Sequence, residues 1–271
     1  MRLKTLFLIL LDGTASFLTV VCTFGQVPLD HDTTVSGVIR TAEQWMEAKS
    51  YHAAREGLGK IFRQPLSAEQ SHQVLSILVR ASYDDHDYEE AYQHSSEFLA
   101  KYPRDNRADE VQFILGVSAF HTKRLSEAIA SLAKFLDEHP SHDRRAAAFY
   151  WRAMSELDLG DQQAAEDDLA KCFDEPTGIP FRDNALMGWA LALERRGEYT
   201  QAAQKLEQLL SDYPRSDLRI DATIRLASIC LRQNTPLKTV ELLQGIRART
   251  NAQRQEYLLL AAEADFQMGS Y

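Results

Sequence analysis

The chain has 271 residues, of which 45% are hydrophobic and 25% are charged, with 12 Gly and 8 Pro. This composition supplies enough apolar side chains for a folded core and too few turn residues for an all-β protein, so it excludes a disordered chain and disfavours a β fold. The net charge of -9 disfavours nonspecific nucleic-acid binding, because such binding needs a basic face to displace phosphate counterions.

The N-terminal segment has the features of a secretory signal. Residues 1–4 carry two basic side chains and residues 5–11 are mostly apolar, as a signal peptide requires. Asp12 interrupts the apolar run, and a buried Asp counts against a permanent membrane anchor. We predict a cleaved signal over residues 1–25 and export to the periplasm or cell envelope. An uncleaved anchor and a cytoplasmic start are the alternatives.

The three cysteines do not indicate a disulfide, a metal site or a lipid anchor. Cys22 lies within the predicted signal, and Val21 stands where lipid attachment would need a small residue. Cys172 and Cys230 fall in different helices of non-adjacent repeats, too far apart for a disulfide and at no metal-ligand spacing. We expect both to be buried as small apolar side chains.

A repeated unit fills the chain after a predicted linker at residues 26–34. Its clearest mark is a small residue near the start of each second helix: Ala54, Ala91, Ala128, Ala165, Ala202 and Val240. Successive marker residues are 37, 37, 37, 37 and 38 residues apart. A fixed period of roughly 20 to 50 residues is typical of a solenoid of stacked units. The sequence therefore predicts one elongated, all-α body over residues 35–271.

Local signals place the two helices of each unit. Apolar residues recur at spacings of three and four, as on one face of a helix. Ser67 and Gln70 form a capping-box pattern at the start of the second unit, and Asp87 is positioned to cap the partner helix. Pro236 follows a cap candidate in the sixth unit, at a helix position where its missing amide is tolerated.

The position twelve residues before each marker is short or β-branched, and in the third unit it is Gly116. Glycine inside a helix costs about 1 kcal/mol relative to alanine. We therefore predict that the two helices of a pair approach closely at this position. The six residues are Ala42, Val79, Gly116, Ala153, Ala190 and Ser228.

The last helical segment, residues 253–268, has no second helix after it. Residues 269–271 repeat the start of the turn that elsewhere leads into a second helix. We predict six helix pairs plus one unpaired final helix in an array truncated in mid-unit, with self-association through that helix. Four of its apolar residues are then expected to be partly exposed: Leu258, Leu259, Ala262 and Phe266.

These turns resemble those of tetratricopeptide repeats. Residues 197–202 read Gly-x-Tyr-x-x-Ala, and a proline follows the marker twelve residues later at Pro103, Pro140 and Pro214. The usual unit has 34 residues, three fewer than this period. A Tyr-Pro step before a polar stretch, at residues 102–103 and 213–214, resembles the variant in envelope proteins such as the outer-membrane barrel-assembly lipoprotein and the Tol-Pal coordinator. The resemblance implies a right-handed α-solenoid that serves as a non-catalytic, protein-binding scaffold of the cell envelope.

The resemblance also implies where a partner binds. In such repeats a concave groove is lined by first-helix positions, which in this chain are apolar or aromatic in the middle units and polar in the flanking ones. We predict that a protein or peptide segment binds there, without nucleic acid and with membrane contact only through an uncleaved N-terminal segment. The alternative is that these side chains only pack against one another. The groove residues are Phe113, Val117, Phe120, Tyr150, Met154, Leu157, Met187 and Leu191.

No residue pattern indicates catalysis, a cofactor or a metal. Residues 84–87 are the densest cluster of oxygen and nitrogen ligands, but they lie in a turn where Asp acts as a cap and adjacent side chains cannot all face one ion. No phosphate-binding loop or hydrolase motif occurs. We predict a protein that is not an enzyme. The alternative is the repeat arm of a larger enzyme, or of a secretion or assembly complex, with its downstream domain missing.

Overall fold

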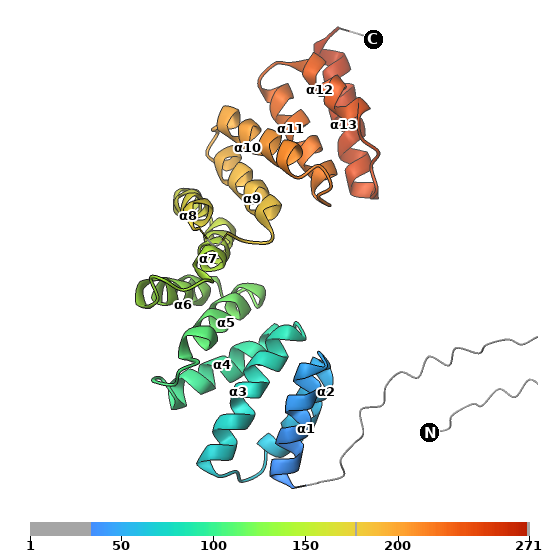
Figure 1. Cartoon of the computed structure of the whole chain (residues 1–271). Coiled ribbons are helices and arrows are strands. Elements are labelled where there is room, and N and C mark those ends of the chain that lie inside the picture. The colour runs from blue at the N-terminus through green and yellow to red at the C-terminus, as the bar shows by residue number, and fades with distance from the viewer. Residues whose placement is uncertain (1–33, 177, 270–271) are drawn as a thin grey trace, which may run out of the picture.

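The computed structural model describes residues 34–176 and 178–269, which form thirteen α-helices and no strand (Figure 1). The prediction of an all-α solenoid of helical hairpins is confirmed. The helices are α1 (Val35–Glu47), α2 (Tyr51–Phe62), α3 (Ala68–Asp84), α4 (Tyr88–Lys101), α5 (Ala108–His121), α6 (Leu125–Glu138), α7 (Arg145–Leu159), α8 (Gln162–Asp174), α9 (Arg182–Arg195), α10 (Tyr199–Asp212), α11 (Arg219–Arg232), α12 (Pro236–Gln244) and α13 (Asn251–Gln267). The predicted signal peptide, Cys22, most of the predicted linker and residues 270–271 lie outside the described residues.

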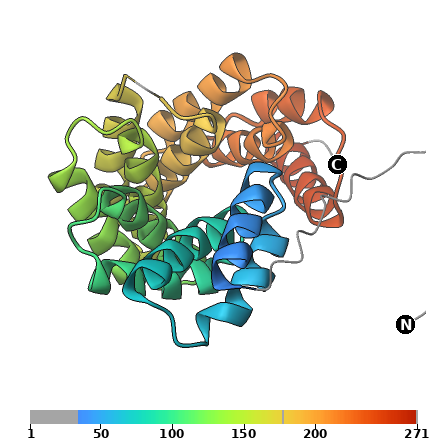
Figure 2. The ribbon, with the colours of Figure 1, turned by 60° about the horizontal axis from the view of Figure 1, so that its bottom comes forward.

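Each helix packs against the next one along the chain. First helices of successive units also touch, in the pairs α1–α3, α3–α5, α5–α7, α7–α9 and α11–α13. In Figure 1 the units climb from α1 at one end to α13 at the other. In Figure 2 the same units follow one another around a ring, so the array is a superhelix. The first helices form one packed row from α1 to α9 and another from α11 to α13, and we call the two together the first-helix face.

Two of the predicted caps are present: Ser67 and Gln70 form a complete capping box at the start of α3, and the Asp87 side chain accepts a hydrogen bond from the Glu90 amide at the start of α4. Pro236 occupies the first turn of α12 as predicted, but the N-cap residue before it, Thr235, makes no side-chain capping bond, because its hydroxyl donates to the Cys230 carbonyl. Cys172 and Cys230 are buried, free thiols, as expected.

A residue in the left-handed region follows the first helix of every unit, with φ between 55° and 95°. Most non-glycine residues avoid this region, so these positions define the turn between paired helices. They are Lys49, His86, Lys123, Gly160, Gly197 and Asn234, each 37 residues after the last. The period is thus constant through the sixth unit.

The sixth marker residue is Thr239, and the assignment of Val240 was wrong by one residue. Thr239 stands 37 residues after Ala202 and is fully buried, whereas Val240 is partly exposed. The Thr239 hydroxyl donates a hydrogen bond to the Ala227 carbonyl at 3.1 Å, which satisfies the buried hydroxyl. The small residue twelve positions earlier is therefore Ala227, which is buried, and not Ser228.

The seventh first helix departs from this period. α12 has only nine residues, and the left-handed Gly269 comes 35 residues after Asn234. Counted back from the turn, Leu258 and Ala262 of α13 correspond to Gln112 and Gly116 of α5. Those two α5 residues face α6, whereas in α13 the equivalent side chains are exposed.

Candidate partner-binding surface

The eight predicted groove residues divide into two sets. Four are half-buried: Phe120, Met154, Met187 and Leu191. Four are almost fully buried: Phe113, Val117, Tyr150 and Leu157. The buried set forms part of the core between neighbouring units, which is the alternative that the sequence left open. Only the half-buried set can offer much surface to a partner.

A line of aromatic rings crosses this face from the second unit to the fifth. Tyr88 stacks on His121 with ring centroids 3.9 Å apart, and His121 lies 5.0 Å from Trp151. Phe181, just before α9, lies 6.0 Å from Trp151. Phe120 and Tyr150 contact the same tryptophan at 5.2 and 5.0 Å. We call this set the aromatic ladder: Tyr88, Phe120, His121, Tyr150, Trp151 and Phe181.

The ladder joins residues that the sequence did not select. Trp151 follows Tyr150 by one residue on α7, but the family's groove positions skip it. Tyr88 belongs to the turn motif, and Phe181 lies in the irregular junction before α9, so neither stood at a groove position. No spacing rule predicts that these rings are half-buried, because the exposure of each ring depends on the neighbours that cover it.

The ladder is largely uncharged. Burial, together with the nearby His86 and Lys123, lowers the pKa of His121, which favours the neutral ring. Burial raises the pKa of Tyr150 to about 12, so its hydroxyl stays protonated. Lys123 lies 5.4 Å from the Phe120 ring centroid and pairs with Asp158 at 2.8 Å. A cation therefore lies at the edge of an apolar strip.

Charged side chains beside the ladder are paired with one another. Arg80 contacts Asp84 at 2.8 Å and Glu110 at 2.7 Å, and Arg144 reaches the same Glu110 at 3.1 Å. Arg144 also lies 5.2 Å from the Phe113 ring centroid. This network fills the polar flank that the sequence predicted.

The acidic side chains of the turn at residues 84–87 form ion pairs with arginines. Arg55 of α2 pairs with Asp85, Asp87 and Glu90 of the next unit. These ion pairs join adjacent units at the turn. Within the described residues, no group of His, Cys, Asp and Glu side chains is arranged to hold a metal ion.

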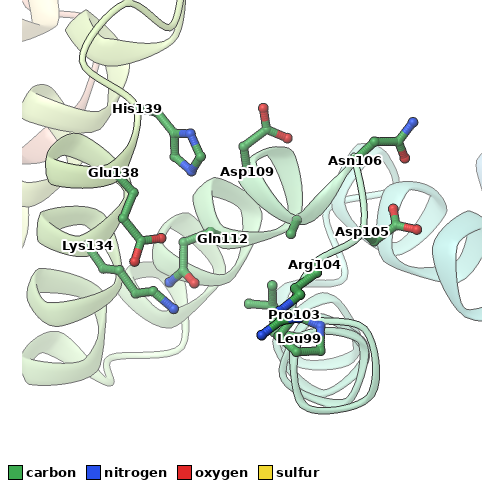
Figure 3. A pocket seen from close by; sticks show the side chains of 11 residues that line it. Leu99, Pro103, Arg104, Asp105, Asn106, Asp109, Gln112, Lys134, Glu138 and His139 are labelled. Atoms are coloured by element: carbon green, nitrogen blue, oxygen red, sulfur yellow. The ribbon is translucent and has the colours of Figure 1, made fainter.

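A separate cavity of about 270 Å³ lies at the junction of the second and third units (Figure 3). Its walls come from the loop after α4, the start of α5 and the end of α6. Arg104 and Lys134 share it with Asp105, Asp109 and Glu138, so both signs of charge line it. This mixed lining favours no single class of ligand.

The YfiO family, whose description is outer membrane lipoprotein, matches the chain over residues 31–125 and again over residues 118–230. Together these matches span more than half of the sequence. The chain belongs to the YfiO family. No curated protein sequence matches it. In the described part of this YfiO-family chain, none of the helices has the length and apolar character needed to cross a membrane.

Solved structures with the same architecture include a tetratricopeptide repeat protein from Parabacteroides merdae, at 15% identity and a TM-score of 0.61 over 87% of each chain. PilF from Pseudomonas aeruginosa is similar at 15% identity and a TM-score of 0.60, over 84% of this chain and 97% of PilF. The apo form of RapI matches at 11% identity and a TM-score of 0.65, over 87% of this chain and 71% of RapI. These likenesses concern the fold, and the prediction of tetratricopeptide repeats is confirmed.

Proposed function

We propose that this protein is a non-catalytic scaffold of the cell envelope that binds a segment of a partner protein along the aromatic ladder. Helical repeat proteins of this architecture typically mediate protein–protein interaction. The observation that carries the proposal is a line of half-buried rings that continues across three unit junctions. Aromatic side chains at such a site act as anchors, because they bury a large area and lose little conformational entropy.

The surroundings of the ladder favour an apolar partner segment. Three further half-buried apolar side chains lie on the same helices: Met154 on α7, and Met187 and Leu191 on α9. The adjoining arginines already have carboxylate partners, so an acidic segment would have to displace them. An amphipathic helix or an extended segment with apolar side chains fits this face best.

The family supports a place in the envelope. Its description is outer membrane lipoprotein, and residues 1–25 carry the predicted export signal. We propose that any membrane attachment runs through that N-terminal segment. That the chain is the repeat arm of a larger assembly stays an alternative prediction.

Self-association through α13 is a second proposal, based on its exposed face. Leu258 and Ala262 stand where other first helices meet their own second helix, and both are exposed. A second α13 running antiparallel can place each leucine over the other copy's alanine. The same arrangement brings Arg254 of one copy near Glu263 and Asp265 of the other. The pairing is thus complementary in shape and charge.

Site-specific photo-crosslinking in the native cell envelope tests the main proposal. A photoreactive phenylalanine at Met154 is expected to crosslink one discrete partner, whereas the same group at exposed Leu237 of α12 serves as the control. The Trp151→Ala variant, probed with the group at Met154, is expected to lose the crosslink while keeping its helical circular dichroism. A crosslink that persists in W151A, or one that is equal at both probe sites, would contradict the ladder as the binding surface.

A further inference from the structure

A second cavity, of about 380 Å³, lies between the start of α11 and the connection from α12 to α13. Its volume falls in the range of small-molecule sites, roughly 300 to 1,000 Å³. Arginine is its commonest lining residue. The lining residues are Pro214, Arg215, Ser216, Arg219, Ile220, Gly245, Arg247 and Arg249.

This cavity is the repeat equivalent of the one in Figure 3. Three periods of 37 residues relate Pro103 and Arg104 of the first cavity to Pro214 and Arg215 of the second. In both cavities two walls are the loop after a second helix and the start of the next first helix. The third wall is the end of α6 in the first cavity and the loop after the shorter α12 in the second.

The acidic side chains of the first cavity are replaced in the second. Asp109 becomes Ile220, and the wall that holds Glu138 in the first cavity is replaced by the loop that holds Arg247 and Arg249. Asp105 becomes Ser216, whose hydroxyl accepts a hydrogen bond from the Leu218 amide at 3.1 Å and donates one to the Asp183 carboxylate of α9, which is not a lining residue. A cavity with both signs of charge has thus become one whose only charged lining residues are arginines.

These arginines are not neutralised within the described residues. Arg215, Arg219 and Arg247 form no ion pair there, and Arg249 has a single carboxylate partner, the fully exposed Asp217 at 3.6 Å. The first turn of α11 adds the positive end of a helix dipole at the same place, and the one acidic side chain of that turn, Asp221, accepts a hydrogen bond from Gln253. In a chain with a net charge of -9, this is a local concentration of positive charge.

We propose that this cavity binds a phosphoryl group, either that of a soluble phosphate monoester or that of a phospholipid head group. Guanidinium groups present planar forks of N–H donors that match phosphate oxygens, and several around one hollow can bind a dianion together. The proposal is independent of the aromatic ladder, because the cavity shares no residue with it.

Calorimetric titration of the full chain with inorganic phosphate and with phenyl phosphate, at fixed low salt, tests the shared chemistry. Vesicles of phosphatidylglycerol, compared with vesicles of phosphatidylcholine, test the head-group source. We expect saturable binding of at least one of these phosphoryl probes, with phosphatidylglycerol preferred among vesicles. Binding of the soluble probes alone assigns a soluble ligand, and vesicle binding that phosphate competes away assigns a head group.

The matched variants are Arg247→Gln with Arg249→Gln, and Arg104→Gln in the equivalent mixed cavity. The double variant is expected to weaken binding at least about tenfold, because it removes two of the four guanidinium groups that line the cavity. R104Q should leave the binding affinity unchanged, and thermal unfolding should show that both variants are folded. Absence of binding by every probe, or equal binding by wild type and the double variant, would overturn the proposal.

Discussion

Gly116 of α5 lies directly against Leu132 of α6. A Cβ atom added to Gly116 would stand 2.5 Å from the Leu132 Cγ and 2.8 Å from its Cδ2, closer than carbon atoms can approach. Leu132 is fully buried, so it has little room to move aside. The glycine is therefore required by the close packing of this helix pair, as its sequence position predicted.

Gly116→Ala should destabilise the protein despite the better helix propensity of alanine. Overpacking costs roughly 1 to 3 kcal/mol, and the propensity gain offsets about 1 kcal/mol of it. Gly59→Ala in α2 is the matched control, because nothing lies within 4 Å of the added Cβ, and it should stabilise by roughly 0.5 to 1 kcal/mol. Urea denaturation of the two variants should give shifts of opposite sign. Equal shifts would contradict this account of Gly116.

The sequence predicted the features that depend on local chemistry. The capping box of Ser67, the cap at Asp87 and the tight position at Gly116 follow from spacings of a few residues. The sixth marker was missed because the small-residue rule passed over a polar threonine, whose hydroxyl is satisfied by the Ala227 carbonyl of the partner helix and, at 3.4 Å, by the Thr235 carbonyl.

The candidate surface was less predictable because burial there is set by neighbouring units. Phe113 and Tyr150 occupy groove positions but are covered by adjacent side chains, whereas Trp151 stays half-exposed one residue away. The repeat places Arg215 at the arginine-lined cavity, as it places Arg104 at the first one. The period does not place Arg247, because Arg247 lies in the loop that follows the unusually short α12.

The register of the sixth unit makes a direct prediction. Thr239→Leu should cost roughly 1 to 3 kcal/mol, because the larger side chain enters a filled site and the hydrogen bond from the Thr239 hydroxyl to the Ala227 carbonyl is lost. Val240→Leu should change stability by less than about 0.5 kcal/mol, because that side chain is partly exposed. Chemical denaturation measures both, and a larger loss in V240L would restore the original assignment.

Glu156 of α7 should make the protein less stable as the pH rises. Burial, and then the negative charge of Asp168, raise the pKa of Glu156 from 4.5 to about 7. The folded state therefore binds more protons than the unfolded state between these values, so the free energy of unfolding falls as pH increases through that window. One oxygen of Glu156 is buried without a hydrogen-bond partner, which is consistent with this direction.

Glu156→Gln should remove this component of the pH dependence. The variant is expected to be more stable than wild type at pH 8, by on the order of 1 to 3 kcal/mol, and to approach wild type near pH 4. Thermal unfolding across this range measures the stability difference between the variant and wild type. The contributions of the other titrating groups cancel in that difference. Glu43→Gln at an exposed site controls for the loss of a surface carboxylate. A pH-independent difference between E156Q and wild type would show that the charge on Glu156 is not its cause.

The exposed face of α13 should drive concentration-dependent dimerisation. Leu258 is 58% exposed, and burying it against a second copy contributes roughly 1.5 to 3 kcal/mol per leucine. Leu258→Arg should therefore raise the dimer dissociation constant by at least about tenfold, because two arginines then meet the apolar centre of the interface. Leu159→Arg, at a similarly exposed leucine that ends the fourth unit's first helix, should leave the dissociation constant unchanged. Sedimentation equilibrium separates the cases: a wild-type chain that stays monomeric at high concentration, or a dimer equally weakened by L159R, would contradict pairing through α13.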